Sequence, residues 1–439
     1  MNIEINFAYA KRPILKEVVE KKAIFDLFAT INNDTKVYDI SKDLSKDVSN
    51  YIDYETKINI KYCGSNTCRF LFFYRAPEQE TRANFHFHTM VGLANKLNRT
   101  MVLTNVGFSR IGSCLHLPFN FYYSVSVLQK RFPNVKFISQ AHFQQWTYER
   151  RNKPNVSHIY INTKPTNNPY SFEFVEPSIE LLLNKQCFDQ FNLKMDDTMI
   201  FKSVNIGPRT SWDTNNSNII MLNYLTSQLN INYEVLLINH DLRYSLFINE
   251  KGVPPVTYAN HLIRAANKVS KELDSYIGIH WRMETNVTKS LTKCANKLVK
   301  WINRIQNTTN ITNVYFATDY PIDNTKKAQS STFHDVTEQH HKAVAILNSS
   351  IHFNTWKSIN SLEYLEELSE LSEILQTEFR GAGVQGIIDK LILIYSNYFV
   401  TGPKGCCRLR SSFTGTVIQA RMALEKAWDP RIKNIVSRW

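Results

Sequence analysis

Short buried strands that alternate with amphipathic helices are the feature that most limits how this chain can fold. The apolar run YIGIHWR at residues 276–282 reads as a strand that ends in charged side chains. Apolar residues at helical spacing predict a helix before it, over 255–271, and another after it, over 291–305, and residues 314–317 read as a second buried strand. Helix, strand, helix and strand in this order predict a parallel sheet with right-handed crossovers, and therefore an α/β fold.

Polar side chains stand at the carboxyl ends of these two strands. They are His280, Arg282 and Asp319. Open α/β sheets bind ligands outside the carboxyl ends of their strands, so we expect the three side chains to converge on one bound molecule. The alternative is a surface salt bridge near a sheet edge, which we favour less because buried polar groups cost free energy unless they are satisfied.

The first half of the chain carries another βαβ pattern. Residues 69–74 and 101–103 read as buried strands, and residues 85–97 read as the helix between them. Residues 152–218 are rich in Asn, Thr and Pro, which favours long loops lying on the sheet. Residues 233–239 close this half as a strand or a short helix.

These patterns predict two α/β domains after an irregular extension. We expect the extension to cover residues 1–59, the first domain residues 60–250 and the second residues 251–439. The hinge between the domains is expected at Gly252–Pro255, where glycine and two prolines interrupt the periodicity.

A second candidate site lies near the end of the chain, where the strand at 398–402 is followed by a loop and then a helix that begins at Ser411 and Ser412. Free N–H groups at a helix N-terminus favour a bound phosphate, although serines also cap helices that bind nothing. The position after a strand favours the binding role. A helix terminus contributes only about 0.3–1 kcal/mol toward an anion, so a diphosphate would also need a cation, which Arg282 can supply.

The composition indicates an anionic partner. The formal net charge is +13 and the sequence pI is about 9.2, but the basic residues are scattered and no basic helix is interleaved with aromatic residues. We therefore predict a phosphate-bearing small molecule and no nucleic acid, while solvation of the surface by lysine explains the charge equally well.

The seven cysteines include no CxxC pair and no zinc-like spacing. Cys63 and Cys68 are close enough for a local disulfide, whereas Cys406 or Cys407 can pair with one of three others, and an odd count leaves at least one thiol free. The three are Cys294, Cys187 and Cys114.

Eight N-glycosylation sequons suit a secretory compartment, although an Asn-rich chain produces many by chance. Their asparagines are Asn33, Asn98, Asn155, Asn215, Asn286, Asn307, Asn310 and Asn348. The segment MNIEINFAYAKRP does not read as a signal peptide, and no segment reaches the length of a membrane helix, so we expect no membrane contact.

Several motifs together resemble the GDP-fucose fucosyltransferases, especially the protein O-fucosyltransferases. The most specific part is the HxR of IGIHWRMET followed by SSF at 411–413. The similarity spans roughly residues 69–421 and also includes RFLFFYR, the LNRT sequence at 97–100, ATD at 317–319 and Asp389.

This resemblance implies a GT-B architecture, in which two Rossmann-like domains face each other across a cleft, the first on the acceptor side and the second binding GDP-fucose. It implies that Arg282 contacts the β-phosphate and the glycosidic oxygen, that His280 supports the nucleotide end and that Asp319 approaches the nucleoside. The remaining donor-binding residues would be Asp389, Ser411, Ser412 and Phe413.

The implied reaction is an inverting transfer, in which an acceptor hydroxyl attacks the anomeric carbon of fucose while GDP departs. An arginine and preorganised donors can stabilise the departing diphosphate without Mg²⁺, so no cofactor or metal is expected, in agreement with the absence of an obvious DxD-type pair. The resemblance also implies the lumen of the endoplasmic reticulum or Golgi.

The chain departs from the family in the loop after its first strand. Family members carry there a glycine-rich loop with an Asn, or Glu-Gly-Phe-Asn, whereas this chain has RAPEQETR at 75–82. Glu78 aligns best with the family Glu and is the candidate general base, with Glu80 as a substitute. Arg82 is expected to bind donor or acceptor. The alternative, that these are solvated loop charges, has equal weight.

Three functions follow from these observations. The favoured one is transfer of fucose to a Ser or Thr hydroxyl of a protein. The alternatives are transfer to a glycan hydroxyl and a catalytically inactive protein that binds a nucleotide sugar, which the altered loop at 78–82 favours.

Overall fold

The computed structural model describes the chain from residue 53 to residue 439 with internal gaps. The gaps are residues 77, 163–170, 175–187, 190–192, 195–199, 206–214, 241–255, 285–287, 323–332, 334, 360–364, 366–372 and 408–410. The predicted hinge, Cys187, Asn33, Asn286 and most of the predicted N-terminal extension therefore lie outside the described residues, as does the side chain of Asn215.

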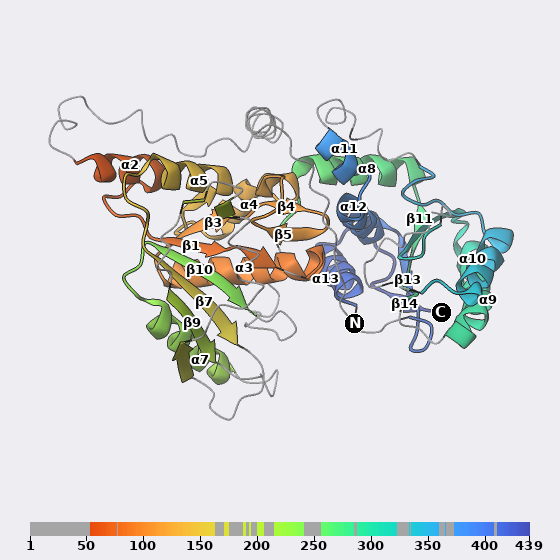
Figure 1. Ribbon diagram of the computed structural model, residues 1–439. Coiled ribbons are helices and arrows are strands. Elements are labelled where there is room, and N and C mark those ends of the chain that lie inside the picture. The colour runs from red at the N-terminus through yellow and green to blue at the C-terminus, as the bar shows by residue number, and fades with distance from the viewer. Residues whose placement is uncertain are drawn as a thin grey trace.

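The first unit is built on a seven-stranded sheet with the order β6-β3-β1-β10-β7-β9-β8 (Figure 1). All pairings are parallel except that of β8 with β9. The strands are β1 (Phe70–Phe73), β3 (Thr100–Leu103), β6 (Phe137–Ser139), β7 (Val156–Asn162), β8 (Ser171–Phe174), β9 (Ile200–Asn205) and β10 (Val235–His240). The helices are α2 (Tyr54–Cys63), α3 (Glu80–Lys96), α4 (Val125–Arg131), α5 (Gln140–Glu149) and α7 (Asn215–Leu229), with the short helix η3 (Phe119–Phe121).

Strand β1 shows why this sheet forms. Its four residues are all buried, so both faces of the strand must be covered. Phe70 packs edge-on against Phe143 and Trp146 of α5, and Phe73 on the other face belongs to the cluster that includes the apolar side of α3. A small sheet of β2 (Arg75–Ala76), β5 (Arg110–Gly112) and β4 (Val106–Gly107) follows β1 and fixes the start of the next loop.

The second unit is built on a four-stranded parallel sheet with the order β12-β11-β13-β14. Its strands are β11 (Tyr276–Trp281), β12 (Asn313–Thr318), β13 (Tyr398–Thr401) and β14 (Ser437–Arg438). Its helices are α8 (Asn260–Leu273), α9 (Leu291–Thr309), α10 (Glu338–Ser350), α11 (Glu373–Phe379), α12 (Ala382–Tyr395) and α13 (Ser412–Lys426), with the short helix η4 (Thr288–Ser290). The predicted sequence of helix, strand, helix and strand is confirmed.

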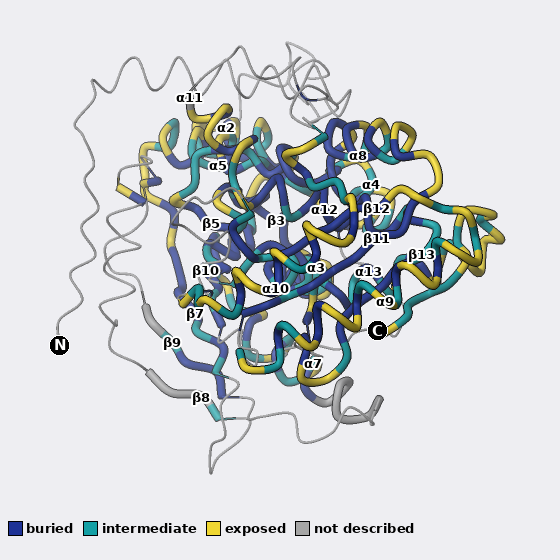
Figure 2. The backbone as a smooth tube through the Cα atoms, turned by 90° about the vertical axis from the view of Figure 1, so that its right-hand side faces the viewer, coloured by how far each residue is buried: buried dark blue, intermediate teal, exposed yellow. Residues whose placement is uncertain are grey.

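The two units lie side by side. In Figure 1, α12 and α13 lie between the sheets and α8 runs along the top of the second unit, whereas α9 and α10 cover the outer face of the second sheet. Figure 2 shows that the central strands of both sheets are buried and that exposed residues gather on the outer helices. The strands of each unit are therefore enclosed by helices, as the predicted α/β class requires.

Two predictions about local structure were wrong. Residues 152–218 were expected to form long loops, but they contain β7, β8 and β9, because β7 pairs with β10 on one side and β9 on the other. Pairing within the sheet here outweighs the low strand propensity of the Asn-rich segments. The irregular extension was expected to reach residue 59, but α2 begins at Tyr54, where the carboxylate of Asp53 accepts the Thr56 N–H and caps the helix.

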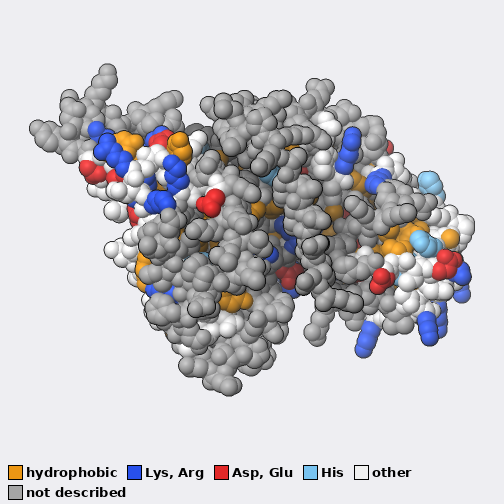
Figure 3. Space-filling view, in the orientation of Figure 1, with side chains coloured by type: hydrophobic (Ala, Val, Ile, Leu, Met, Phe, Trp, Pro, Cys, Tyr) orange, Lys and Arg blue, Asp and Glu red, His pale blue; other side chains and the backbone are white. Residues whose placement is uncertain are grey.

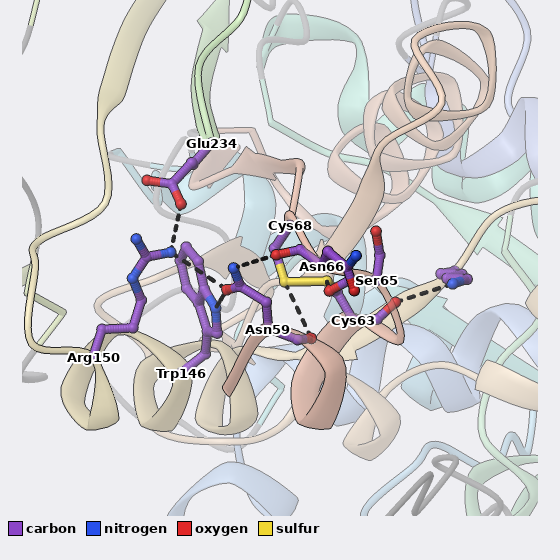
Figure 4. The surroundings of a disulfide bond; sticks show 9 residues. Asn59, Cys63, Ser65, Asn66, Cys68, Trp146, Arg150 and Glu234 are labelled. Carbon is purple, nitrogen blue, oxygen red and sulfur yellow. Dashed lines mark hydrogen bonds and ion pairs between the residues drawn. A yellow bond between two sulfur atoms is a disulfide. The ribbon is translucent and has the colours of Figure 1, made fainter. Parts of the chain in front are cut away.

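The local disulfide predicted between Cys63 and Cys68 is confirmed, with an S–S distance of 2.10 Å. Figure 4 shows its surroundings at the amino end of β1, where Trp146 donates to Asn59 over 2.9 Å and Asn59 donates to the Asn66 carbonyl over 2.9 Å. The first bond attaches α2 to α5, and the second attaches α2 to the loop that the disulfide closes. They lie at the edge of the first sheet opposite the carboxyl ends of its strands.

A second disulfide joins Cys294 to Cys406, which settles one of the pairings that the sequence leaves open. Cys114 is also disulfide-bonded, and Cys407 is a buried free cysteine. Within the described residues, no helix is long and apolar enough to cross a membrane.

Candidate active site

His280 and Phe413 form a stacked pair at the end of β11. Their ring centroids lie 4.5 Å apart, and His280 Nδ1 lies 2.9 Å from the Thr414 hydroxyl. Burial, together with the nearby charge of Arg282, lowers the pKa of His280 to about 3. The imidazole is therefore neutral at physiological pH, and it orients Phe413 and Thr414 without adding a charge.

Arg282 follows β11 directly and forms an ion pair with Glu284. The Arg282 side chain is 19% exposed, whereas that of Glu284 is 1% exposed, so a buried carboxylate holds a guanidinium that can still reach solvent. Sequence reasoning did not identify Glu284. The only signal was the presence of a carboxylate two residues after Arg282.

Asp319 fastens the end of β12 to the same segment. Its carboxylate accepts the backbone N–H groups of Met283 over 2.7 Å and Glu284 over 3.1 Å. Burial raises the pKa of Asp319 to about 6, against the effects of the Met283 N–H and the Arg282 charge, which lower it. His280, Arg282 and Asp319 therefore lie together, and Asp319 supports the backbone that presents Arg282.

The N-terminus of α13 lies beside this group. Ser411 is the N-cap residue, its hydroxyl accepts the Thr414 N–H over 3.4 Å, and its side chain is buried. Ser412 is exposed on the first turn. The helix therefore points its free N–H groups toward the end of β11, which is the arrangement that favours an anion. Thr414 was not identified from the sequence, although it follows the SSF motif directly.

Asp389 lies apart from these residues. It stands in the middle of α12 and accepts a hydrogen bond of 2.5 Å from the hydroxyl of Tyr315 in β12. Burial raises the pKa of Asp389 to about 7. In the described structure its hydrogen bonds go to Tyr315 and Gln385, so it braces the helix against the sheet.

Glu78 lies in the loop just before α3, and Arg82 lies in the first turn of α3. They form an ion pair of 3.3 Å, and their side chains are 29% and 40% exposed, respectively. Glu78 also acts on the pKa of Arg110, which burial and the charge of Arg75 lower and which Glu78 raises. The Glu78 carboxylate is therefore partly accessible and surrounded by positive charge.

Glu80 has a different environment, although it is only two residues from Glu78. It is buried, and Lys390 of α12 donates to it over 2.6 Å. The hydroxyls of Tyr123 and Tyr258 donate to the same carboxylate over 3.1 and 3.2 Å. Glu80 thus joins the two units through Lys390. The sequence signal for this partner was a single lysine inside the apolar run IIDKLILIY.

The LNRT sequence has a structural role at the other end of the first sheet. The Arg99 guanidinium donates to the carbonyls of Phe70, Tyr233 and Ile231 over 3.3, 2.8 and 2.7 Å. These carbonyls lie near the amino ends of β1 and β10. This motif therefore stabilises the sheet and does not line the site.

Charged side chains of both signs are visible in the hollow between the two units (Figure 3). Among the described residues, no group of three or more His, Cys, Asp or Glu side chains is arranged to hold a metal ion.

Two α/β units with mainly parallel sheets, an arginine at a strand end and a helix N-terminus beside it are typical of nucleotide-sugar transferases with the GT-B fold. The chain belongs to the GDP-fucose protein O-fucosyltransferase family, whose model matches residues 82–423. It is therefore a GDP-fucose-dependent fucosyltransferase, as the sequence predicts. No curated protein matches the chain significantly.

Solved structures of fucosyltransferases are similar to the chain at low identity. POFUT1 in complex with GDP-fucose is 12% identical, with a TM-score of 0.47 over 80% of this chain and 94% of that chain. The fucosyltransferase NodZ from Bradyrhizobium is 10% identical, with a TM-score of 0.37 over 80% of this chain and 92% of that chain.

Proposed function

We propose that this enzyme transfers fucose from GDP-fucose to a Ser or Thr hydroxyl of a protein, with inversion and without a metal ion. The observation that carries the proposal is the group formed by Arg282, the stacked pair of His280 and Phe413, and the N-terminus of α13. It combines a cation, an aromatic surface and free N–H groups, which are the features that a nucleoside diphosphate needs. The description of the family, GDP-fucose protein O-fucosyltransferase, supports a protein acceptor.

On the donor side, Arg282 stabilises the charge that develops on GDP as the glycosidic bond breaks. Glu284 and Asp319 hold the guanidinium and its backbone before the reaction, so little reorganisation is needed in the transition state. Ser411 and Ser412 place the α13 N–H groups near the phosphates. Phe413, which stacks on His280, is the proposed aromatic contact for the base.

On the acceptor side, Glu78 is the proposed general base. Its carboxylate is partly exposed and pairs with Arg82 over 3.3 Å, so an acceptor hydroxyl can reach it. Glu80 was the substitute candidate, but its carboxylate is buried and already accepts from Lys390, Tyr123 and Tyr258. These contacts favour Glu78. Arg82 then orients the base and contacts donor or acceptor.

We further propose that the protein works in the lumen of the endoplasmic reticulum or Golgi. The two described disulfides are of the kind that persists in oxidising compartments. The sequon asparagines whose exposure the structure describes are all exposed, namely Asn98, Asn155, Asn307, Asn310 and Asn348. A shift in electrophoretic mobility after endoglycosidase treatment of the protein from secreting cells would support this location, and absence of glycan would count against it.

The acceptor can be tested with radiolabelled GDP-fucose and two pools of acceptor, one of secreted protein domains and one of free oligosaccharides. We expect label on protein that alkaline β-elimination releases, because that reaction cleaves sugars linked to Ser and Thr. Arg282→Ala is the control for enzyme-dependent transfer. Label only on oligosaccharides would assign a glycan acceptor. Binding of GDP-fucose with no transfer to either pool would favour the inactive alternative.

A further inference from the structure

Lys390 is a fully buried cation at the junction of the two units. Its ammonium group donates to Glu80 of α3 over 2.6 Å and to the Tyr258 hydroxyl over 2.5 Å. The Lys390 side chain is 1% exposed and that of Glu80 is 5% exposed. Figure 1 shows the end of α3 that faces the second unit beside α13. This ion pair is therefore a direct contact between the acceptor-side unit and the donor-side unit.

The same ammonium group also faces the proposed nucleotide site. Lys390 Nζ lies 5.4 Å from the centroid of the Phe413 ring, within the range of a cation–π interaction. Phe413 in turn stacks on His280 at 4.5 Å. A continuous line of contacts thus leads from Glu80, through Lys390 and Phe413, to His280.

Stability alone does not explain why charges occupy this position. Removing two charges from water costs free energy, and well-packed apolar residues of similar volume often stabilise a protein equally well. The charges fix the orientation of the Lys390 side chain, because its ammonium group must contact Glu80 while it stays over the Phe413 ring. Glu80 is the first residue of α3 and lies two residues after Glu78, so the ion pair also fixes the end of the loop that carries the proposed base.

We propose that Lys390 is a positioning residue, which holds Phe413 in its nucleotide-binding orientation and fixes that ring relative to the loop carrying Glu78. This inference rests on the proposed function. It predicts that Lys390 affects GDP binding through Phe413, and that its effect disappears when the ring is absent.

The test is a double-mutant cycle on GDP affinity, measured by titration calorimetry with Lys390→Met, Phe413→Leu and the combined variant. We expect Lys390→Met to weaken GDP binding about tenfold in the native background. In the Phe413→Leu background the same substitution should weaken binding less than about twofold. A residue that only stabilises the fold would give equal losses in both backgrounds, and that result would overturn the inference.

A second pair of variants separates positioning from folding. Lys390→Met alone leaves Glu80 as an unpaired buried charge, whereas Glu80→Gln combined with Lys390→Met is neutral and keeps an acceptor for Tyr123 and Tyr258. We expect this neutral variant to melt close to the native temperature and still bind GDP about tenfold more weakly. If Lys390→Met does not fold, the neutral variant with and without Phe413→Leu completes the cycle. Native GDP affinity in the neutral variant would overturn the inference.

Tyr122→Phe provides a matched control at the same junction. Tyr122 of the first unit donates to the buried Glu378 of α11. Its loss should lower the melting temperature while GDP affinity stays within about twofold. If the native protein fails to bind GDP, the proposed function fails and this inference with it. If the native protein binds GDP and the cycle is additive, this inference alone fails.

Discussion

The end of β11 and the start of α3 both present charged side chains toward the junction, but they hold them in different ways. Arg282 follows a buried strand directly, and partners from adjacent segments, Glu284 and Asp319, fix it. Glu78 stands in a loop, its described ion pair is with the half-exposed Arg82, and the neighbouring Glu80 turns inward to Lys390. A strand end therefore fixes where its side chain points, whereas in the loop two glutamates two residues apart have opposite environments.

If the end of β11 is the rigid side of the site, Arg282→Ala should have the largest effect of any substitution. Removing the charge that stabilises departing GDP should lower turnover about 10³-fold, because a preorganised donor acts mainly in the transition state. Fucose transfer at saturating GDP-fucose measures this loss. Arg431→Ala is a matched control, since Arg431 forms a surface ion pair with Asp429, and its turnover should be unchanged. Normal turnover of Arg282→Ala would refute the assigned role.

The contrast between the two glutamates gives the next largest effect. Glu78→Gln should lower turnover about 10²-fold and leave GDP affinity unchanged, because a general base acts only on the acceptor hydroxyl. Transfer rates and calorimetry together separate these quantities.

Glu80→Gln is the comparison that sharpens this assignment. It removes one partner of a buried ion pair and should lower the free energy of unfolding by about 3–5 kcal/mol. The melting temperature should therefore fall in Glu80→Gln and stay native in Glu78→Gln. A lower melting temperature in Glu78→Gln and a native one in Glu80→Gln would instead make Glu78 the structural residue and Glu80 the candidate base.

The pH dependence of stability tests how Asp319 is held at the end of β12. Its pKa is about 6 in the folded protein, against an ordinary value of 3.8, so the folded state keeps the proton longer than the unfolded state does. Between about pH 4 and 6 the unfolded state is the more ionised, and this group's contribution to stability falls by roughly 2–3 kcal/mol as the pH rises.

Asp319→Asn should remove that dependence. The free energy of unfolding of Asp319→Asn, relative to that of the native protein, should therefore increase from pH 4 to pH 6. Above pH 6 the difference should stay constant. Denaturant unfolding at several pH values measures it. A difference that does not change with pH would show that burial does not perturb Asp319.

The same contrast explains which parts of the site could be predicted from the sequence. The strand that contains His280 and is followed by Arg282 was predictable, because a short run of apolar residues is typical of a buried strand in a parallel sheet. The helix that begins at Ser411 and Ser412 was predictable because its apolar residues recur at helical spacing after another such strand. The inward turn of Glu80 was not predictable. It depends on Lys390 and Tyr258, which are distant in the sequence and reach Glu80 only after the two units meet. Residues 152–218 were misread for a related reason, since β7 forms by pairing with the distant β10, β9 then pairs with β7, and β8 pairs with β9.

The two serines at the start of α13 give the smallest expected effect and separate capping from binding. Ser411 is buried and caps the helix, so Ser411→Ala should lower the free energy of unfolding by about 1 kcal/mol. Ser412 is exposed, and Ser412→Ala should leave stability unchanged. If Ser412 contacts a phosphate, its loss should weaken GDP binding about three- to fivefold, because a helix terminus contributes up to about 1 kcal/mol toward an anion. Equal GDP affinity in the native protein and Ser412→Ala would limit the contribution of α13 to its backbone N–H groups, and Arg282 would then carry most of the charge stabilisation.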